Sequence, residues 1–132
     1  MTAVDTNILV RFLVRDDERQ AEAARKRLKQ AEARRERLQI PLLVVLETIW
    51  VLESAYDKTR SEILDSIRDM RQMPVFDFEA DGVIEGFLND GPKYRADLAD
   101  ILIAHSAEAI GCDAGITFDK AAAKLPFFSL LK

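Results

Sequence analysis

The feature that most constrains the fold of this 132-residue chain is the alternation of short apolar segments with longer helical ones. The short segments are expected to form strands at 3–5, 39–41, 75–78 and 115–118, with 127–131 as a last strand or tail. Helices are expected at 7–14, 17–37, 43–56, 59–73, 79–89 and 97–110, with a single helical turn at 120–124. Strands separated by helices pair in parallel, with helices on both faces of the sheet. The chain is therefore predicted to be an α/β protein, a three-layer α/β/α sandwich around a short, mostly parallel central sheet.

Length and composition fit one domain covering residues 1–132. Hydrophobic residues make up 48% of the chain, enough for a core, and charged residues make up 32%, as in ordinary globular proteins. The sequence has no apolar run of about 18 residues and no basic-then-apolar layout at its N-terminus. We therefore expect a cytoplasmic protein that is not embedded in a membrane.

The chain has one cysteine, Cys112, and one histidine, His105. A single cysteine excludes an internal disulfide and a cysteine-based zinc site. RNA cleavage without a metal usually needs a paired general acid and base, most often histidines, so that chemistry is disfavoured. The net charge of −4 also differs from the basic excess of nonspecific nucleic-acid binders. A phosphate-bearing substrate would need a local attractor, such as a bound divalent cation.

Two aspartates lie at the ends of predicted strands. Asp5 ends the first strand and Asp119 follows the strand at 115–118, and each precedes a predicted helix or helical turn. In open parallel sheets, ligands bind outside the carboxyl ends of the strands. Both aspartates are therefore candidates for a site at that edge, although each could instead be the N-cap of the helix that follows it.

Three further acids lie on predicted helices. Asp97 and Asp100 are three residues apart and share a helix face, with Asp97 at the helix start, where a negative charge is favoured. Asp100 lies one turn further in, before the apolar run Ile-Leu-Ile-Ala, where a carboxylate is harder to explain as a surface group. Glu47 interrupts the apolar segment LLVVLETIWVL at 42–52. A charge there indicates either one solvated edge of a helix or a water-filled hole in which the carboxylate meets a cation.

These positions suggest one metal-binding pocket into which Asp5, Glu47, Asp100 and Asp119 converge. Carboxylates that lie so close would repel one another unless a cation neutralised them. Hard oxygen ligands without cysteine or histidine suit Mg²⁺ or Mn²⁺. We hypothesise that Asp5 and Asp100 hold the principal cation and that Glu47 and Asp119 complete the pocket, directly or through water.

Several other polar residues have weaker functional interpretations. Thr6, Asn7 and Thr117 lie beside the strand-end aspartates and could orient them through hydrogen bonds, although they are also ordinary turn residues. The helix at 17–37 mixes eight basic residues with several glutamates. A solvated face is the simpler interpretation of such a mixture. The alternative is a surface that faces RNA or a partner, with Arg25, Arg27 and Arg34 as its candidate contacts.

The aromatic, thiol and imidazole side chains are assigned structural roles. Trp50 and the phenylalanines are expected in the core, because nothing places them in a row as a base-stacking surface would. Cys112, which follows Gly111, is expected to be a small buried residue. His105 is expected on the side of a helix, as a surface or hydrogen-bonded residue.

Taken in order, four segments resemble the signature of PIN-domain nucleases and, within that group, of the VapC toxins of bacterial toxin–antitoxin pairs. They are VDTNIL at 4–9, VVLETIWVL at 44–52, DLADILIA at 97–104, and GC at 111–112 with TFD at 117–119. The stretch 53–96 carries no such motif. The resemblance implies an α/β/α sandwich, dependence on Mg²⁺ or Mn²⁺, and endoribonuclease activity. It also implies a homodimer that is inhibited by a small antitoxin protein.

The same resemblance assigns roles to individual residues. The catalytic, metal-binding acids would be Asp5, Glu47, Asp100 and Asp119, with Asp97 as an additional acid and with Asn7 and Thr117 as supporting polar residues. One alternative is a PIN-type nuclease that processes RNA without an antitoxin. A phosphatase of the haloacid-dehalogenase type would need a second aspartate two residues after the first, where this chain has asparagine. The non-enzymatic alternative is an acidic protein-interaction module whose carboxylates are caps and surface groups.

Overall fold

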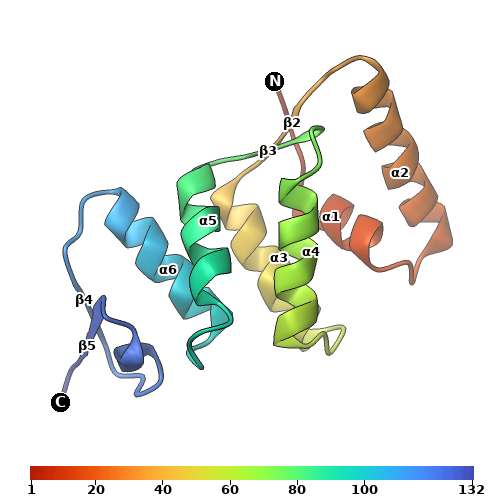
Figure 1. The fold of residues 1–132 in the computed structure, drawn as a ribbon. Helices are drawn as coiled ribbons and strands as arrows, with labels where there is room; N and C mark the ends of the chain where they lie inside the picture. Colours follow the sequence, from red (N-terminus) through yellow and green to blue (C-terminus); the bar gives the residue numbers. More distant parts are fainter. The chain divides into compact units, whose positions relative to one another are not determined.

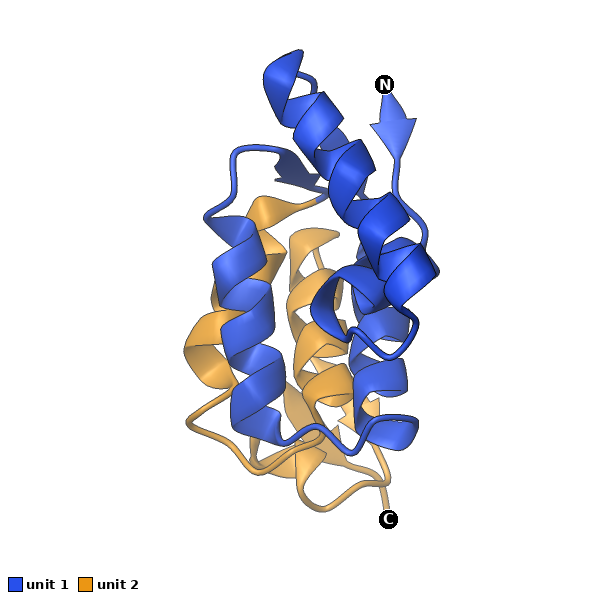
Figure 2. Ribbon diagram, turned by 90° about the vertical axis from the view of Figure 1, so that its right-hand side faces the viewer, with its two compact units in different colours: residues 1–79 blue, residues 80–132 orange.

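The computed structural model describes residues 1–132 without a gap. The chain divides into two compact units, Met1–Glu79 and Ala80–Lys132, which Figure 2 distinguishes by colour. The boundary falls directly after the third strand of the chain, so each unit has its own helices and its own small sheet.

Unit 1 contains a three-stranded sheet and four helices (Figure 1). In chain order these elements are β1 (Thr2–Ala3), α1 (Thr6–Leu13), α2 (Glu18–Ala33), β2 (Leu38–Ile40), α3 (Leu42–Ser54), α4 (Arg60–Arg71) and β3 (Phe76–Phe78). The sheet has the order β1-β2-β3, and both pairings are parallel. Leu38 lies opposite Thr2 on one side and Phe76 on the other, so β2 is the central strand.

Unit 2 contains two α-helices, one short 3₁₀ helix and a two-stranded sheet (Figure 1). Its elements are α5 (Asp81–Asp90), α6 (Leu98–Ala109), β4 (Gly115–Thr117), η1 (Ala122–Lys124) and β5 (Phe128–Leu130). The pairing of β4 with β5 is again parallel, and Ile116 lies opposite Ser129. The predicted α/β class and the parallel pairing of the strands are therefore confirmed.

Most element boundaries agree with the sequence prediction, and the end of α2 is the clearest exception. The helix was expected to reach about Arg37 but ends at Ala33. Arg35 adopts a left-handed backbone conformation with a φ of 55°, and the amide of Glu36 donates back to the carbonyl of Ala31 at 2.8 Å. This is the geometry of a Schellman motif. Because an arginine occupies the position where glycine is usual, the sequence shows no stop signal there.

The start of α4 agrees with the helix predicted at 59–73. Thr59 and Glu62 form a capping box, in which the Thr59 hydroxyl accepts the Glu62 amide at 3.2 Å and Glu62 accepts the Thr59 amide at 2.9 Å. α2 buries a narrow apolar stripe, with every member at most 4% exposed. Its members are Ala21, Ala24, Leu28 and Ala31.

The core of unit 2 lies where α5 packs on α6. Phe87 and Ile101 are fully buried in this region. Gly86 of α5 faces the ring of His105, and a Cβ atom at Gly86 would lie only 2.4 Å from His105 Nδ1. The other ring nitrogen, Nε2, lies 2.7 Å from Asp90 Oδ2. The expectation that His105 is a hydrogen-bonded residue on a helix side is thus confirmed.

Among the helices of both units, none combines the length and the apolar character that a membrane span requires.

Candidate metal centre

Three aspartates gather in unit 2. Asp97 immediately precedes α6, Asp100 lies in its first turn, and Asp119 follows β4 by two residues. One carboxylate oxygen of each lies within 4.8 Å of those of the other two. Asp97 and Asp119 are exposed, and Asp100 is partly buried. The start of α6 and the end of β4 thus present their carboxylates to the same small volume.

The electrostatics of this cluster are visible at Asp100. Burial raises the pKa of the Asp100 carboxyl, and the negative charges of Asp97 and Asp119 raise it further. Both effects disfavour the ionised carboxylate in the folded protein. A divalent cation would relieve them, and carboxylate oxygens are the hard ligands that Mg²⁺ and Mn²⁺ prefer. The donor set of the cluster therefore fits such an ion.

Hydrogen bonds hold the loop that carries Asp119. Asp119 Oδ1 accepts the amide of Ala122 at 2.9 Å, so the carboxylate caps the helical turn that follows it. The amide of Asp119 in turn donates to Thr117 Oγ1 at 3.0 Å. The sequence suggested that Thr117 could orient the carboxylate, and in the structure it bonds the backbone of Asp119. Both bonds restrict where the carboxylate can point.

A second group of polar residues lies in unit 1, around the start of α1. Asp5 is the N-cap of this helix, and its Oδ1 accepts the amide of Thr6 at 2.7 Å. Thr6 is 4% exposed, and its hydroxyl donates to Glu47 Oε1 on α3. Thr6 therefore connects Asp5 and Glu47, which are 42 positions apart in the sequence but belong to one hydrogen-bonded group.

The structure shows on which side of α3 the Glu47 carboxylate lies. The buried face of α3 consists of Val45, Ile49 and Leu52, each at most 2% exposed, together with Thr48. Glu47 lies on the exposed face. The carboxylate is therefore at a solvated edge of the helix, with a hydroxyl donor rather than a basic side chain as its hydrogen-bond partner.

The model of the PIN domain family matches residues 2–128. This chain belongs to the PIN domain family. No match was found among curated proteins. PIN domains are typically metal-dependent nucleases, and the clustered carboxylates of this PIN domain suit that chemistry.

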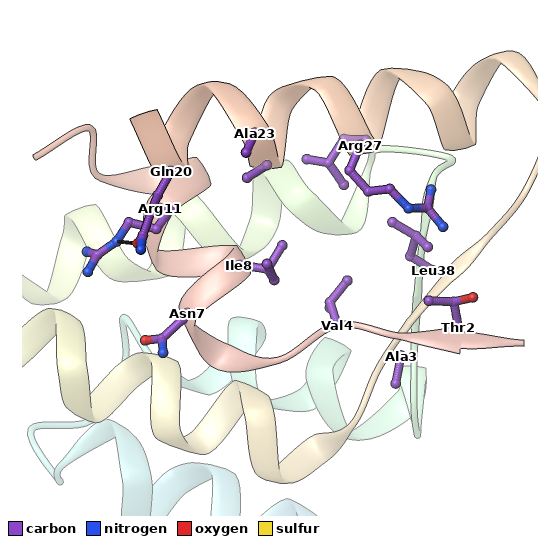
Figure 3. A pocket seen from close by; sticks show the side chains of 12 residues that line it. Thr2, Ala3, Val4, Asn7, Ile8, Arg11, Gln20, Ala23, Arg27 and Leu38 are labelled. Atoms are coloured by element: carbon purple, nitrogen blue, oxygen red, sulfur yellow. Dashed lines mark hydrogen bonds between the residues drawn. The ribbon is translucent and has the colours of Figure 1, made fainter. Parts of the chain in front are cut away.

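Asn7 lines a groove on unit 1 of the PIN domain rather than bonding to Asp5. The groove has a volume of about 490 Å³ and lies between β1, α1 and α2, with Leu38 of β2 at one end (Figure 3). Ile8 and Val4 contribute apolar surface to it, and Arg11, which is hydrogen-bonded to Gln20 at 2.6 Å, lies at its rim.

The positive charge of the basic helix α2 of the PIN domain is partly neutralised by neighbouring acids. Arg25 pairs with Glu22 on the same helix, and Arg27 pairs with Glu36 at 3.0 Å. Of the three arginines that the sequence nominated as RNA contacts, Arg34 is the one without a salt bridge. This pairing favours the interpretation of α2 as a solvated face.

Three residues of the PIN domain that were expected to be buried are exposed. One is Phe118, which directly follows β4 and is 77% exposed. Trp50 is 65% exposed, because the buried face of α3 is filled by smaller side chains. Cys112 is exposed in the loop that follows α6, where Gly111 turns the chain with a φ of 99°. A signal for Trp50 was present: it lies three residues after Glu47 and so shares the helix face of that acid. The prediction missed this signal because α3 is apolar on almost every side.

Proposed function

We propose that this PIN domain is an endoribonuclease that depends on Mg²⁺ or Mn²⁺. The observation that supports it best is the cluster of Asp97, Asp100 and Asp119, in which a partly buried carboxylate with a raised pKa lies beside two others. In this proposal Asp100 is the principal metal ligand of unit 2. Asp119 completes the site directly or through water, and Asp97 is an additional acid.

The proposal assigns Asp5 and Glu47 of unit 1 to the same metal-dependent reaction. Asp5 would hold the metal together with Asp100, and the Thr6 hydroxyl restricts the position of Glu47 by donating to one of its two oxygens. Bound by these carboxylates, a divalent cation supplies an activated water and neutralises charge on the scissile phosphate. Attack by water would leave a 5′-phosphate and a 3′-hydroxyl, without use of the 2′-hydroxyl.

Incubation of the purified protein with structured RNA and Mg²⁺ tests this function. Cleavage should be abolished by a chelator and reduced by about 100-fold or more in Asp100→Asn, because asparagine keeps the shape but removes the negative ligand. Asp113→Asn, an exposed aspartate outside the cluster, is the matched control and should cleave normally. A product ending in a 2′,3′-cyclic phosphate, or full activity in Asp100→Asn, would rule the mechanism out.

The biological role proposed for this nuclease is that of a VapC-like toxin, a homodimer acting in the cytoplasm and inhibited by a small antitoxin. It is supported by the four ordered motifs of the sequence. Expression of the wild-type chain should then arrest bacterial growth, whereas Asp100→Asn should not. Co-expression of a small protein encoded next to the gene should restore growth. Growth arrest that no neighbouring reading frame relieves would favour an RNA-processing nuclease instead.

A further inference from the structure

The exposed face of α3 combines a carboxylate with two large apolar side chains. Leu43, Glu47 and Trp50 are spaced at i, i+4 and i+7, which places them along one face of the helix. Leu43 is 77% exposed and Trp50 is 65% exposed. Trp50 lies only about 4.5 Å further along the helix axis than Glu47, at 1.5 Å per residue. The single tryptophan of the chain is therefore in solvent, next to an acid of the proposed reaction.

This exposure is not required by the packing of unit 1. The buried face of α3 is already complete without Trp50, since Val45, Ile49 and Leu52 are at most 2% exposed. The Trp50 ring takes part in neither of the two aromatic pairs of the structure. Because the hydrophobic effect favours burial of so large a ring, an exposed tryptophan beside a functional group indicates a surface that something covers.

We propose that Trp50 is a stacking surface for one base of the single-stranded RNA substrate, next to the phosphate that is cleaved. The inference rests on the proposed nuclease function and adds a substrate-binding residue to it. Aromatic side chains commonly hold single-stranded RNA by stacking on its bases. Glu47 and Trp50 lie on the same face of α3, less than one helical turn apart, so a base on Trp50 would lie next to that acid.

The charge of the protein supports a stacking contribution to affinity. The net charge is −4, and Arg25 and Arg27 of the basic helix are already paired with glutamates. Attraction between these side chains and phosphates is therefore weak. Base stacking does not depend on net charge and accepts any base, because every base has an aromatic face.

The patch suits a nucleotide better than a second copy of this chain. Glu47 lies between Leu43 and Trp50, so a protein surface laid across all three would bury a carboxylate. Burial of a carboxylate without a basic partner is costly. A single base can cover Trp50 and leave Glu47 in water.

The fluorescence of Trp50 provides the test, because no other tryptophan contributes to the signal. A single-stranded oligoribonucleotide of mixed sequence is titrated into the full chain with Ca²⁺ in place of Mg²⁺, and electrophoresis confirms that the RNA stays intact. Binding should quench the tryptophan emission. By anisotropy of labelled RNA, Trp50→Ala should weaken the Kd by about tenfold or more, as expected for the loss of one stacked base. Trp50→Phe should keep the Kd within about threefold, because it keeps a ring.

Leu43→Ala is the matched control, since it removes another exposed apolar side chain from the same helix face and should leave the Kd within about threefold. RNA binding without quenching, or an unchanged Kd in Trp50→Ala, would overturn the inference. So would a shift from dimer to monomer in Trp50→Ala with an unaltered Kd, which would identify a contact between copies. If the wild type cleaves RNA while Trp50→Ala binds it normally, only this inference fails. If the wild type neither binds nor cleaves RNA, the proposed function fails as well.

Discussion

Among single residues, Asp100 has the most telling environment. Its carboxyl is partly buried beside two other acids, and its pKa is raised by that burial and by their charges. Such a group destabilises the metal-free fold when it is ionised, because the unfolded chain would solvate it better. Carboxylates gathered to bind a cation therefore lower the stability of the metal-free protein.

The first prediction concerns Asp100→Asn in metal-free protein near neutral pH. Removing one of three neighbouring negative charges should raise the midpoint of thermal unfolding of the metal-free protein by a few degrees. The increase in that midpoint that Mn²⁺ produces in the wild type should be absent from the variant. Scanning calorimetry with and without Mn²⁺ measures both effects. Destabilisation of the metal-free variant would mean that the Asp100 carboxylate has a structural partner instead.

A second prediction at this scale compares two buried threonines. Thr6 donates to Glu47, so Thr6→Val should reduce RNA cleavage by about tenfold through loss of the position of Glu47. Thr48, which directly follows Glu47 on α3, is 1% exposed, and its hydroxyl has no hydrogen-bond partner. Thr48→Val should therefore leave cleavage unchanged and leave the free energy of unfolding equal or slightly higher. Equal cleavage by both variants would show that the Thr6 hydroxyl does not position the acid.

Among pairs of elements, the packing of α5 against α6 depends on Gly86, which has no side chain. Gly86→Ala would place a Cβ 2.4 Å from His105 Nδ1 and push the ring away from Asp90. We expect a loss of about 1–3 kcal/mol in the free energy of unfolding, as for other overpacked contacts. Gly82→Ala, on the same helix with nothing near its Cβ, should instead stabilise by up to about 1 kcal/mol. Urea denaturation measures both, and adding His105→Ala to Gly86→Ala should restore most of the loss.

The capping box of α4 leads to a pH-dependent prediction. Hydrogen bonds from the backbone and side chain of Thr59 lower the pKa of Glu62 below its ordinary value. A carboxyl group whose pKa is lowered on folding stabilises the folded protein at pH values above its ordinary pKa. That stabilisation is lost as the pH falls through the lowered pKa. The thermal midpoint of Glu62→Gln should therefore lie below that of the wild type at neutral pH and approach it in acid. A difference that persists in acid would contradict a charge-dependent cap.

The elements that the sequence predicted well are those with local signals. The capping box at Thr59 and the apolar stripe of α2 act within a few residues and are visible in the chain itself. The end of α2 was missed because Arg35 adopts a conformation that usually signals itself through glycine. The exposure of Trp50 was missed because periodicity cannot identify the open side of a helix that is apolar almost all round. The candidate acids could be named from the sequence. That the carboxylates of Asp97, Asp100 and Asp119 lie within 4.8 Å of one another depends on the tertiary position of β4 relative to α6, which no local sequence pattern encodes.

At the scale of the whole molecule, the proposed function assigns Asp5 and Asp100 to the same cation. Asp100 belongs to Ala80–Lys132 and Asp5 to Met1–Glu79. Asp5→Asn is a clean test of that assignment, because asparagine is as good an N-cap as aspartate and should leave α1 intact. Any loss of metal binding in this variant can therefore be assigned to the missing charge.

The most direct measurement is calorimetric titration of Mn²⁺ into the wild type, Asp5→Asn, Asp100→Asn and the control Asp113→Asn. The wild type and the control should bind with the same Kd, and Asp5→Asn and Asp100→Asn should each weaken binding by about tenfold or more. If Asp5→Asn binds Mn²⁺ as tightly as the wild type while Asp100→Asn does not, the metal belongs to unit 2 alone and the shared site is wrong.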